Sequence, residues 1–196
     1  MDAIITLSQL YPAVFYSLVF FVSLMVGSFL NVVIYRLPIM MERSWQQEYQ
    51  SYFSEGAPTP HDKNSSASEE VFNLVKPDST CPSCGHKIRA WENVPVISYL
   101  FLKGKCAKCK VGISVRYPLV ELFTALACTF AAYQFGVTSQ ALWAVLFTYI
   151  LVALLFIDLD KMLLPDQLTL PLLWLGLLLS TQHIFVSTTV AIIGSA

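Results

Sequence analysis

The stretch RYPLVELFTALACTFAAYQFGVTSQALWAVLFTYILVALLFIDLDK, residues 116–161, decides the fold of this chain. Glu121 is its only charge between the opening arginine and the polar end DLDK. A helix that crosses a membrane needs about 20 predominantly apolar residues. The polar turn GVTSQ divides the run, so the stretch predicts two membrane-spanning helices, near residues 117–135 and 142–157.

Apolar runs on either side of this stretch predict further spans. Residues 3–35 carry no charge and hold one span, near 13–35. No Asp, Glu, Lys or Arg follows Gln167, so we expect a short span at 168–180 and a further segment from Ile184. A cleaved signal peptide is disfavoured, because the first run lacks a basic leading region and its apolar part is too long. Only 13% of the residues are charged, against about 25% in soluble domains. The sequence therefore predicts an all-α polytopic membrane protein, a transmembrane helix bundle.

The positive charges predict its orientation. Eleven of the twelve lysines and arginines lie from Arg36 to Arg116, in the loop that joins the first two spans, and the other is Lys161. Cytoplasmic loops carry an excess of Lys and Arg. The rule weakens for loops longer than about 60 residues, as this one is, but Arg36 and Arg116 stand directly at span ends, where it counts most. We therefore expect a cytoplasmic loop, an external amino terminus, and Asp158 and Lys161 at the cytoplasmic face.

The chain divides into four expected parts. The loop opens with MMERSWQQEYQSYF, which reads either as a solvated helix or as a helix lying on the membrane surface. SEGAPTPHDKNSSASEE, rich in Pro, Ser, Gly and acid, reads as a flexible linker in which His61 is a solvated residue. The parts are residues 1–37 (amino terminus and first span), 38–80 (cytoplasmic helix and linker), 81–116 (a four-cysteine zinc module) and 117–196 (the remaining spans).

Two cysteine pairs carry the strongest metal signal. CPSC supplies Cys81 and Cys84, and CAKC supplies Cys106 and Cys109. Two residues between thiolates let one tight turn give two of the four ligands of tetrahedral zinc. The interval between the pairs slightly exceeds the usual spacing of about 15–20 residues. Disulfides are the alternative, but a reducing cytoplasm argues against them. Since protein fills all four positions, the zinc is expected to be structural.

Other residues near the pairs have plainer readings. The lysines of the module would offset the charge of four thiolates: Lys87, Lys103, Lys105, Lys108 and Lys110. His86 reads as a surface residue rather than a ligand, and Cys128 as an apolar filler inside the second span.

Small and polar residues inside the spans predict helix contacts. Gly27 and Ser28 would let another helix approach closely, and Asn31 should hydrogen-bond across to another helix. Acids inside membrane spans are rare and by default suggest function. Glu121 therefore reads either as half of an ion pair, with Arg116 as an imperfect partner, or as a site residue.

The stretch FIDLDKMLLPDQLTL at the end of the third span holds three aspartates. Asp160 and Lys161 can sit in water, and Asp166 can cap the helix that follows Pro165. Asp158 is the deepest of the three, and we expect partial burial to raise its pKa. Paired carboxylates can divide acid and base roles to activate a water molecule. From the residues alone, the three aspartates are explained equally well as ordinary polar residues at the ends of helices, with no catalytic role.

Taken together, these motifs resemble those of the bifunctional type IV prepilin peptidases, which are also N-methyltransferases. The resemblance rests on GSFLNVVIYRLP, CPSC, WENVPVISYLFLKGKC, CAKC, RYPLVELFTAL and IDLDKMLLPDQLT in that order, and covers nearly the whole chain apart from the linker. It implies an aspartyl protease of the bacterial inner membrane. Such an enzyme cuts the leader from prepilins and pseudopilins and methylates the new amino terminus with S-adenosylmethionine, for type IV pili or type II secretion.

The resemblance also assigns residues. The family's first catalytic aspartate stands eight residues before the Asp or Asn that follows a proline, which matches Asp158, with Asp166 as the motif landmark. Glu121 matches no catalytic position. The second catalytic aspartate belongs to a later GxGD motif that is not among these 196 residues. We therefore expect an amino-terminal portion of a longer enzyme, inactive as a protease by itself.

Two other functions stay open at this point. One is a non-catalytic, membrane-anchored zinc-ribbon adaptor of a secretion or pilus machine, and the other is an enzyme limited to methyl transfer. No glycine-rich nucleotide loop marks a site for the methyl donor. The expected partners are prepilins and the lipid bilayer, and no nucleic acid.

Overall fold

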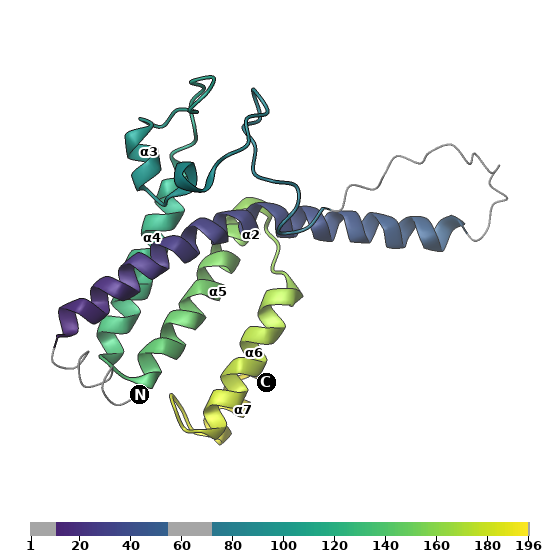
Figure 1. The fold of residues 1–196 in the computed structure, drawn as a ribbon. Coiled ribbons are helices and arrows are strands. Elements are labelled where there is room, and N and C mark those ends of the chain that lie inside the picture. The colour runs from purple at the N-terminus through teal and green to yellow at the C-terminus, as the bar shows by residue number, and fades with distance from the viewer. Residues whose placement is uncertain (1–10, 55–71, 196) are drawn as a thin grey trace.

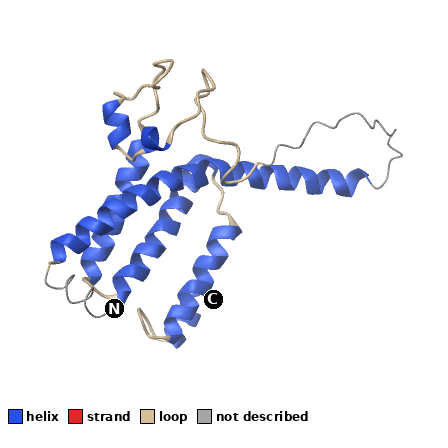
Figure 2. Cartoon of the chain, in the orientation of Figure 1, coloured by secondary structure: helices blue, strands red, loops and turns tan. Residues whose placement is uncertain are grey.

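Helices form the framework of the chain, and no β-strand occurs in residues 11–54 and 72–195, which are the parts that the structure describes (Figures 1 and 2). The structure is a computed structural model. The predicted linker beyond Ser54, with His61, lies outside these ranges. The elements are α2 (Pro12–Ser54), the 3-10 helix η1 (Ala90–Asn93), α3 (Ile97–Phe101), α4 (Arg116–Phe135), α5 (Ser139–Lys161), α6 (Asp166–Thr181) and α7 (Thr188–Ser195).

Three helices, α2, α4 and α5, are long and apolar enough to cross a membrane, which confirms the prediction of an all-α membrane bundle. The turn GVTSQ separates α4 from α5 as expected, because Gly136 takes a positive φ of 64° and the Thr138 side chain accepts a hydrogen bond from the Ala141 N–H. The predicted short span is helix α6, whose 16 residues reach only about 24 Å at 1.5 Å per residue. That is less than the roughly 30 Å of a hydrocarbon core.

Helix α2 is longer than the first predicted span. It continues without a break for 43 residues and includes Pro38. The sequence predicted a span followed by a separate cytoplasmic helix, and the boundary placed after Leu37 falls inside this one helix. The carboxyl-terminal end of the helix leaves the bundle and projects away from it (Figure 1).

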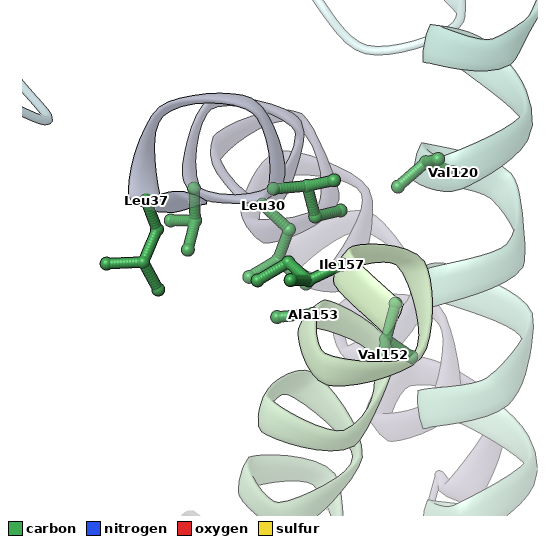
Figure 3. Packing of buried hydrophobic residues seen from close by; sticks show 8 residues of the cluster. Leu30, Leu37, Val120, Val152, Ala153 and Ile157 are labelled. Atoms are coloured by element: carbon green, nitrogen blue, oxygen red, sulfur yellow. The ribbon is translucent and has the colours of Figure 1, made fainter. Parts of the chain in front are cut away.

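The main apolar core lies where α2, α4 and α5 meet (Figure 3). α2 contributes one face of its helix, and Val120 and Ile157 are fully buried between the helices. The members of this core are Leu30, Val33, Ile34, Leu37, Val120, Val152, Ala153 and Ile157. A second core farther along the bundle contains Cys128, which is fully buried, so its predicted role as an apolar filler is confirmed.

Gly27 and Asn31 join α2 to α4 as the sequence predicted. A Cβ atom on Gly27 would lie 2.9 Å from the Glu121 Cα, so the absence of a side chain allows the two backbones to approach this closely. The Asn31 Nδ2 donates a hydrogen bond to the Tyr117 carbonyl oxygen over 3.1 Å. α2 and α4 are therefore fixed together at the end of the bundle that carries the cysteine loops (Figure 1).

Candidate functional site

The four predicted metal-ligating cysteines converge. The sulfur atoms of Cys81, Cys84, Cys106 and Cys109 all lie within 4.8 Å of one another. Cys81 and Cys109 have their sulfurs 3.8 Å apart, and none of the chain's five cysteines is in a disulfide. Zinc–sulfur bonds of about 2.3 Å in a tetrahedron would place the sulfurs about 3.8 Å apart. The cluster can therefore hold a metal ion such as zinc.

The two cysteine turns share one backbone design. In the first, the Gly85 N–H donates to the Cys81 carbonyl oxygen over 2.9 Å. In the second, the Lys110 N–H donates to the Cys106 carbonyl oxygen over 3.1 Å. Both donors have a left-handed backbone, with φ of 65° at Gly85 and 60° at Lys110. Gly85 suits this turn because glycine takes a positive φ at little cost. Lys110 adopts the same conformation although it has a side chain.

Backbone N–H groups prepare the second turn for a thiolate. Those of Cys109 and Lys108 point at the Cys106 sulfur and lower the pKa of that thiol to about 6, whereas burial and the neighbouring sulfurs raise the pKa of the Cys109 thiol to about 11. A deprotonated thiol is the form that binds a metal. The first turn differs in its surroundings: Lys87 forms an ion pair with Asp78 over 3.0 Å, and the His86 Nε2 faces Glu92 at 3.1 Å. His86 is not a member of the four-residue cluster.

Glu121 connects the cysteine module to the bundle. Its side chain is buried, and its Oε2 accepts a hydrogen bond of 2.8 Å from the Val96 N–H. The Ser28 hydroxyl is a second partner. Val96 has a φ of 57°, an outlying conformation for a β-branched residue, directly before helix α3. The contact therefore holds a strained turn of the module against α2 and α4.

The alternative reading of Glu121 as an ion-pair partner of Arg116 is wrong. The Arg116 guanidinium instead donates to the Asp160 carboxylate, at the end of α5. Lys161 pairs with Glu42 of α2 over 3.1 Å. Asp160 and Lys161 are thus not merely solvated, as the sequence suggested, but tie the end of α5 to α4 and α2.

Asp158 lies in the last turn of α5, and its backbone carbonyl accepts the capping N–H of Met162. The expectation of partial burial is wrong, because its neighbour Ile157 takes the core-facing side and leaves Asp158 exposed about 100° away around the helix. Its carboxylate has no hydrogen bond or ion pair among the parts of the chain that the structure describes. It is therefore open to a further partner.

Asp166 is not the helix cap that the sequence predicted. Pro165 occupies the N-cap position of α6, and Asp166 is the first residue of that helix, exposed and without a capping hydrogen bond. The reason is that the rigid, fully buried proline itself sets the extended backbone that enters the helix. An acidic residue in the first turn still interacts favourably with the positive end of the helix dipole.

Arg36 is a residue whose role the sequence did not reveal. It is buried, and its guanidinium donates to the carbonyl oxygens of Asn73 over 3.0 Å and Pro77 over 2.7 Å. Its place directly after an apolar span was the one available signal. Its partners are backbone atoms about 40 positions away, which no side-chain pattern marks.

Comparison with known proteins places this arrangement in a family. The family model described as "Bacterial Peptidase A24 N-terminal domain" matches residues 21–135, which includes most of the first span, the cysteine module and α4. The chain belongs to this family. A second family model, "Type IV leader peptidase family", matches residues 145–196, which includes Asp158. These matches confirm the family resemblance inferred from the motifs. No solved structure matches the chain.

Curated relatives extend the similarity over the whole chain. A protein named "Prepilin leader peptidase/N-methyltransferase" from Aeromonas salmonicida is 53% identical over 195 residues, covering 100% of this chain and 65% of its own length. Proteins of the same name from Pseudomonas aeruginosa and Neisseria gonorrhoeae are 48% and 46% identical, covering 94% and 88% of this chain. The chain thus spans less than two thirds of the length of these relatives.

Proposed function

We propose that this chain contributes Asp158 as one of two catalytic aspartates to a membrane peptidase that removes the leader from prepilins or pseudopilins. Relatives that match 100% and 94% of this chain carry that activity in their names. The observation that carries the proposal is the position of Asp158. It stands exposed at the end of a membrane-spanning helix, beside charged residues that mark the polar boundary.

The position suits a substrate that is itself anchored in the bilayer. A prepilin would lie with its apolar segment in the membrane and its basic leader in water, so its scissile bond would reach the depth of Asp158. The second aspartate, in the GxGD motif that the resemblance implies, would belong to a chain of the relatives' length. Two close carboxylates share one proton, because two neighbouring negative charges are costly.

In this proposal the ionised carboxylate takes a proton from water while the oxygen of that water attacks the scissile carbonyl carbon. The protonated carboxyl group gives its proton to the carbonyl oxygen. The tetrahedral intermediate then collapses and the C–N bond breaks. The leaving nitrogen receives a proton from the first carboxyl group, and the second carboxylate takes back a hydroxyl proton of the intermediate, which regenerates the pair. Asp158 is one of these two groups. The two carboxyl groups titrate together, so which of them is ionised at the start is a property of the pair and not of either residue alone.

We further propose that the metal of the four-cysteine cluster is zinc in a structural role. Four sulfur ligands close a tetrahedral site and leave no position for water or substrate. The zinc would hold the two turns together, and Glu121 would fix the module to the bundle. The new amino terminus would receive a methyl group from S-adenosylmethionine, as the names of the relatives imply. The cysteine module and Asp158 would face the cytoplasm in a bacterial inner membrane.

The decisive experiment compares two aspartates in the full-length gene product, incubated with a purified prepilin. Asp158→Asn should abolish cleavage of the leader, because the amide cannot exchange the proton. Asp166→Asn is the matched control, since the family motif accepts Asn at that position, and it should cleave at close to the normal rate. Near-normal cleavage by Asp158→Asn would overturn the assignment and favour the non-catalytic adaptor.

A further inference from the structure

Among the side chains that the structure describes, three exposed aromatic residues lie on the end of α2 that leaves the bundle. Trp45, Tyr49 and Tyr52 are 48%, 64% and 79% exposed. They are spaced by four and then three residues, so at about 100° per residue they lie on one side of the helix. We call these three residues the aromatic stripe. Neither the catalytic proposal nor the metal cluster gives it a role.

The aromatic stripe continues the side of α2 that faces α5. Ile34 belongs to the core between α2 and α5, and Met41 packs against that core. Met41 stands one helical turn before Trp45 on the same side. The next residue, Glu42, pairs with Lys161 at the end of α5 over 3.1 Å. Helix α5 spans the membrane, and its end at Lys161 touches α2 at this point. The side of α2 that faces α5, and with it the aromatic stripe, therefore points toward the membrane.

The opposite side of α2 is occupied by the chain that leads into the cysteine module. The Arg36 guanidinium binds the backbone of residues 73 and 77, and the Arg43 guanidinium lies 4.2 Å from the centre of the Phe72 ring. Helix geometry places Arg36 and Arg43 on one side, and Gln47 follows Arg43 by one turn. The polar side of the extension therefore faces the module and water.

These two sets of contacts fix how the extension is oriented. In Figure 1 it runs across the direction of α5 and α6, at the end of the bundle that lies toward the cysteine loops. A helix that lies across the bundle at its polar end runs along the membrane surface. Its module-facing side is then in water, and its α5-facing side meets the lipid headgroups.

We propose that residues 41–52 of α2 form an interfacial helix whose aromatic stripe inserts among the headgroups of the bilayer. Trp and Tyr are enriched at this depth, because their rings are apolar and their N–H and O–H groups still reach water. The extension carries Glu42, Arg43 and Glu48 and so has no positive excess. Its attachment therefore depends on the aromatic rings and not on anionic lipid.

The test measures the depth of Trp45. The chain has four tryptophans, and replacing Trp91, Trp143 and Trp174 with Phe leaves Trp45 as the single fluorophore. The protein is reconstituted in phosphatidylcholine vesicles that contain lipids brominated near the headgroup or near the chain ends, and iodide is added as an aqueous quencher. The matched control adds Trp45→Phe and Gln47→Trp, which moves the ring by about 160° to the polar side of the same helix.

The expected result is that bromine near the headgroup quenches Trp45 at least about twofold more than it quenches the ring at position 47, with iodide showing the reverse order. Salt should not change either result. Equal iodide access at both positions would overturn the proposal. So would a Trp45 shielded from iodide and not quenched by any brominated lipid, since protein would then cover it. As a second measurement, Trp45→Phe in the otherwise unaltered chain should remove a component quenched by headgroup bromine, and an unchanged signal would contradict the proposal.

Discussion

The helical bundle and the cysteine module are held together by different forces. In the bundle, side chains such as Val120, Ile157 and Cys128 are fully buried between helices. In residues 81–112, among the side chains that the structure describes, only Cys81, Pro95 and Cys106 are buried, and two of these are candidate metal ligands. We therefore infer that the bundle depends on packing and the module on a metal held by the four cysteines. The two should fail independently when either is damaged, which leads to four predictions in order of decreasing effect.

Removal of one metal ligand should have the largest effect. Cys81→Ser should reduce the zinc content from one per chain to none and unfold the module, because structural zinc supplies an apparent binding free energy of about 10–16 kcal/mol in small zinc domains. Zinc analysis and hydrogen exchange of residues 81–112 measure both outcomes. The bundle helices should keep their exchange protection.

The matched control is Cys128→Ala, which removes a buried cysteine from the bundle instead. It should retain one zinc per chain. Loss of metal from this variant, or its retention by Cys81→Ser, would contradict the division between the two regions.

A side chain at Gly27 should damage the bundle and leave the metal in place. The new Cβ of Gly27→Ala would lie 2.9 Å from the Glu121 Cα, so α2 and α4 must move apart, at a cost of about 2–3 kcal/mol. Thermal unfolding in detergent measures this loss. Gly176→Ala is the control, because its Cβ would meet only Phe147, at 3.8 Å, and it should be neutral or slightly stabilising. Equal stability of the two variants would refute the close approach at Gly27.

Glu121 links the regions, and its removal should uncouple them. Glu121→Ala leaves the Val96 N–H without its acceptor, which costs about 1–2 kcal/mol. The Val96 amide should then exchange faster with solvent, while zinc content stays at one per chain. Glu121→Gln keeps an acceptor oxygen and should exchange at an intermediate rate. Unchanged exchange in Glu121→Ala would show that the contact does not hold the module.

The ion pair between Lys161 and Glu42 should matter least. Both side chains are about half exposed, and exposed pairs contribute at most about 1 kcal/mol. Lys161→Ala should therefore lower the stability slightly, and added salt should shrink the difference between this variant and the unaltered protein. A loss of several kcal/mol would mean that the end of α5 is held mainly by charge.

Patterns that are local in the sequence predicted much of this structure. Nearly charge-free runs located α4 and α5, the spacing of four cysteines located the cysteine cluster, and Gly27 and Asn31 each marked a helix contact. These signals work because a lipid environment, a metal and a close helix approach each demand particular residue types. The sequence therefore indicated the kind of fold and the kind of site.

Contacts between distant residues could not be predicted in this way. The pairing of Arg116 with Asp160 joins residues 44 positions apart, and the Glu121 contact is to a backbone N–H that no residue type marks. The exposure of Asp158 depends on which side of α5 faces the core, and its neighbour Ile157 takes that side. Pro38 indicated a helix end, but α2 continues through it.

The most direct test of the account measures zinc content and leader cleavage in the same preparation of full-length Asp158→Asn protein. The account predicts one zinc per chain and no detectable cleavage, because the metal supports the module while Asp158 performs the chemistry. Normal cleavage would contradict the role of Asp158, and loss of zinc would contradict the independence of the two regions.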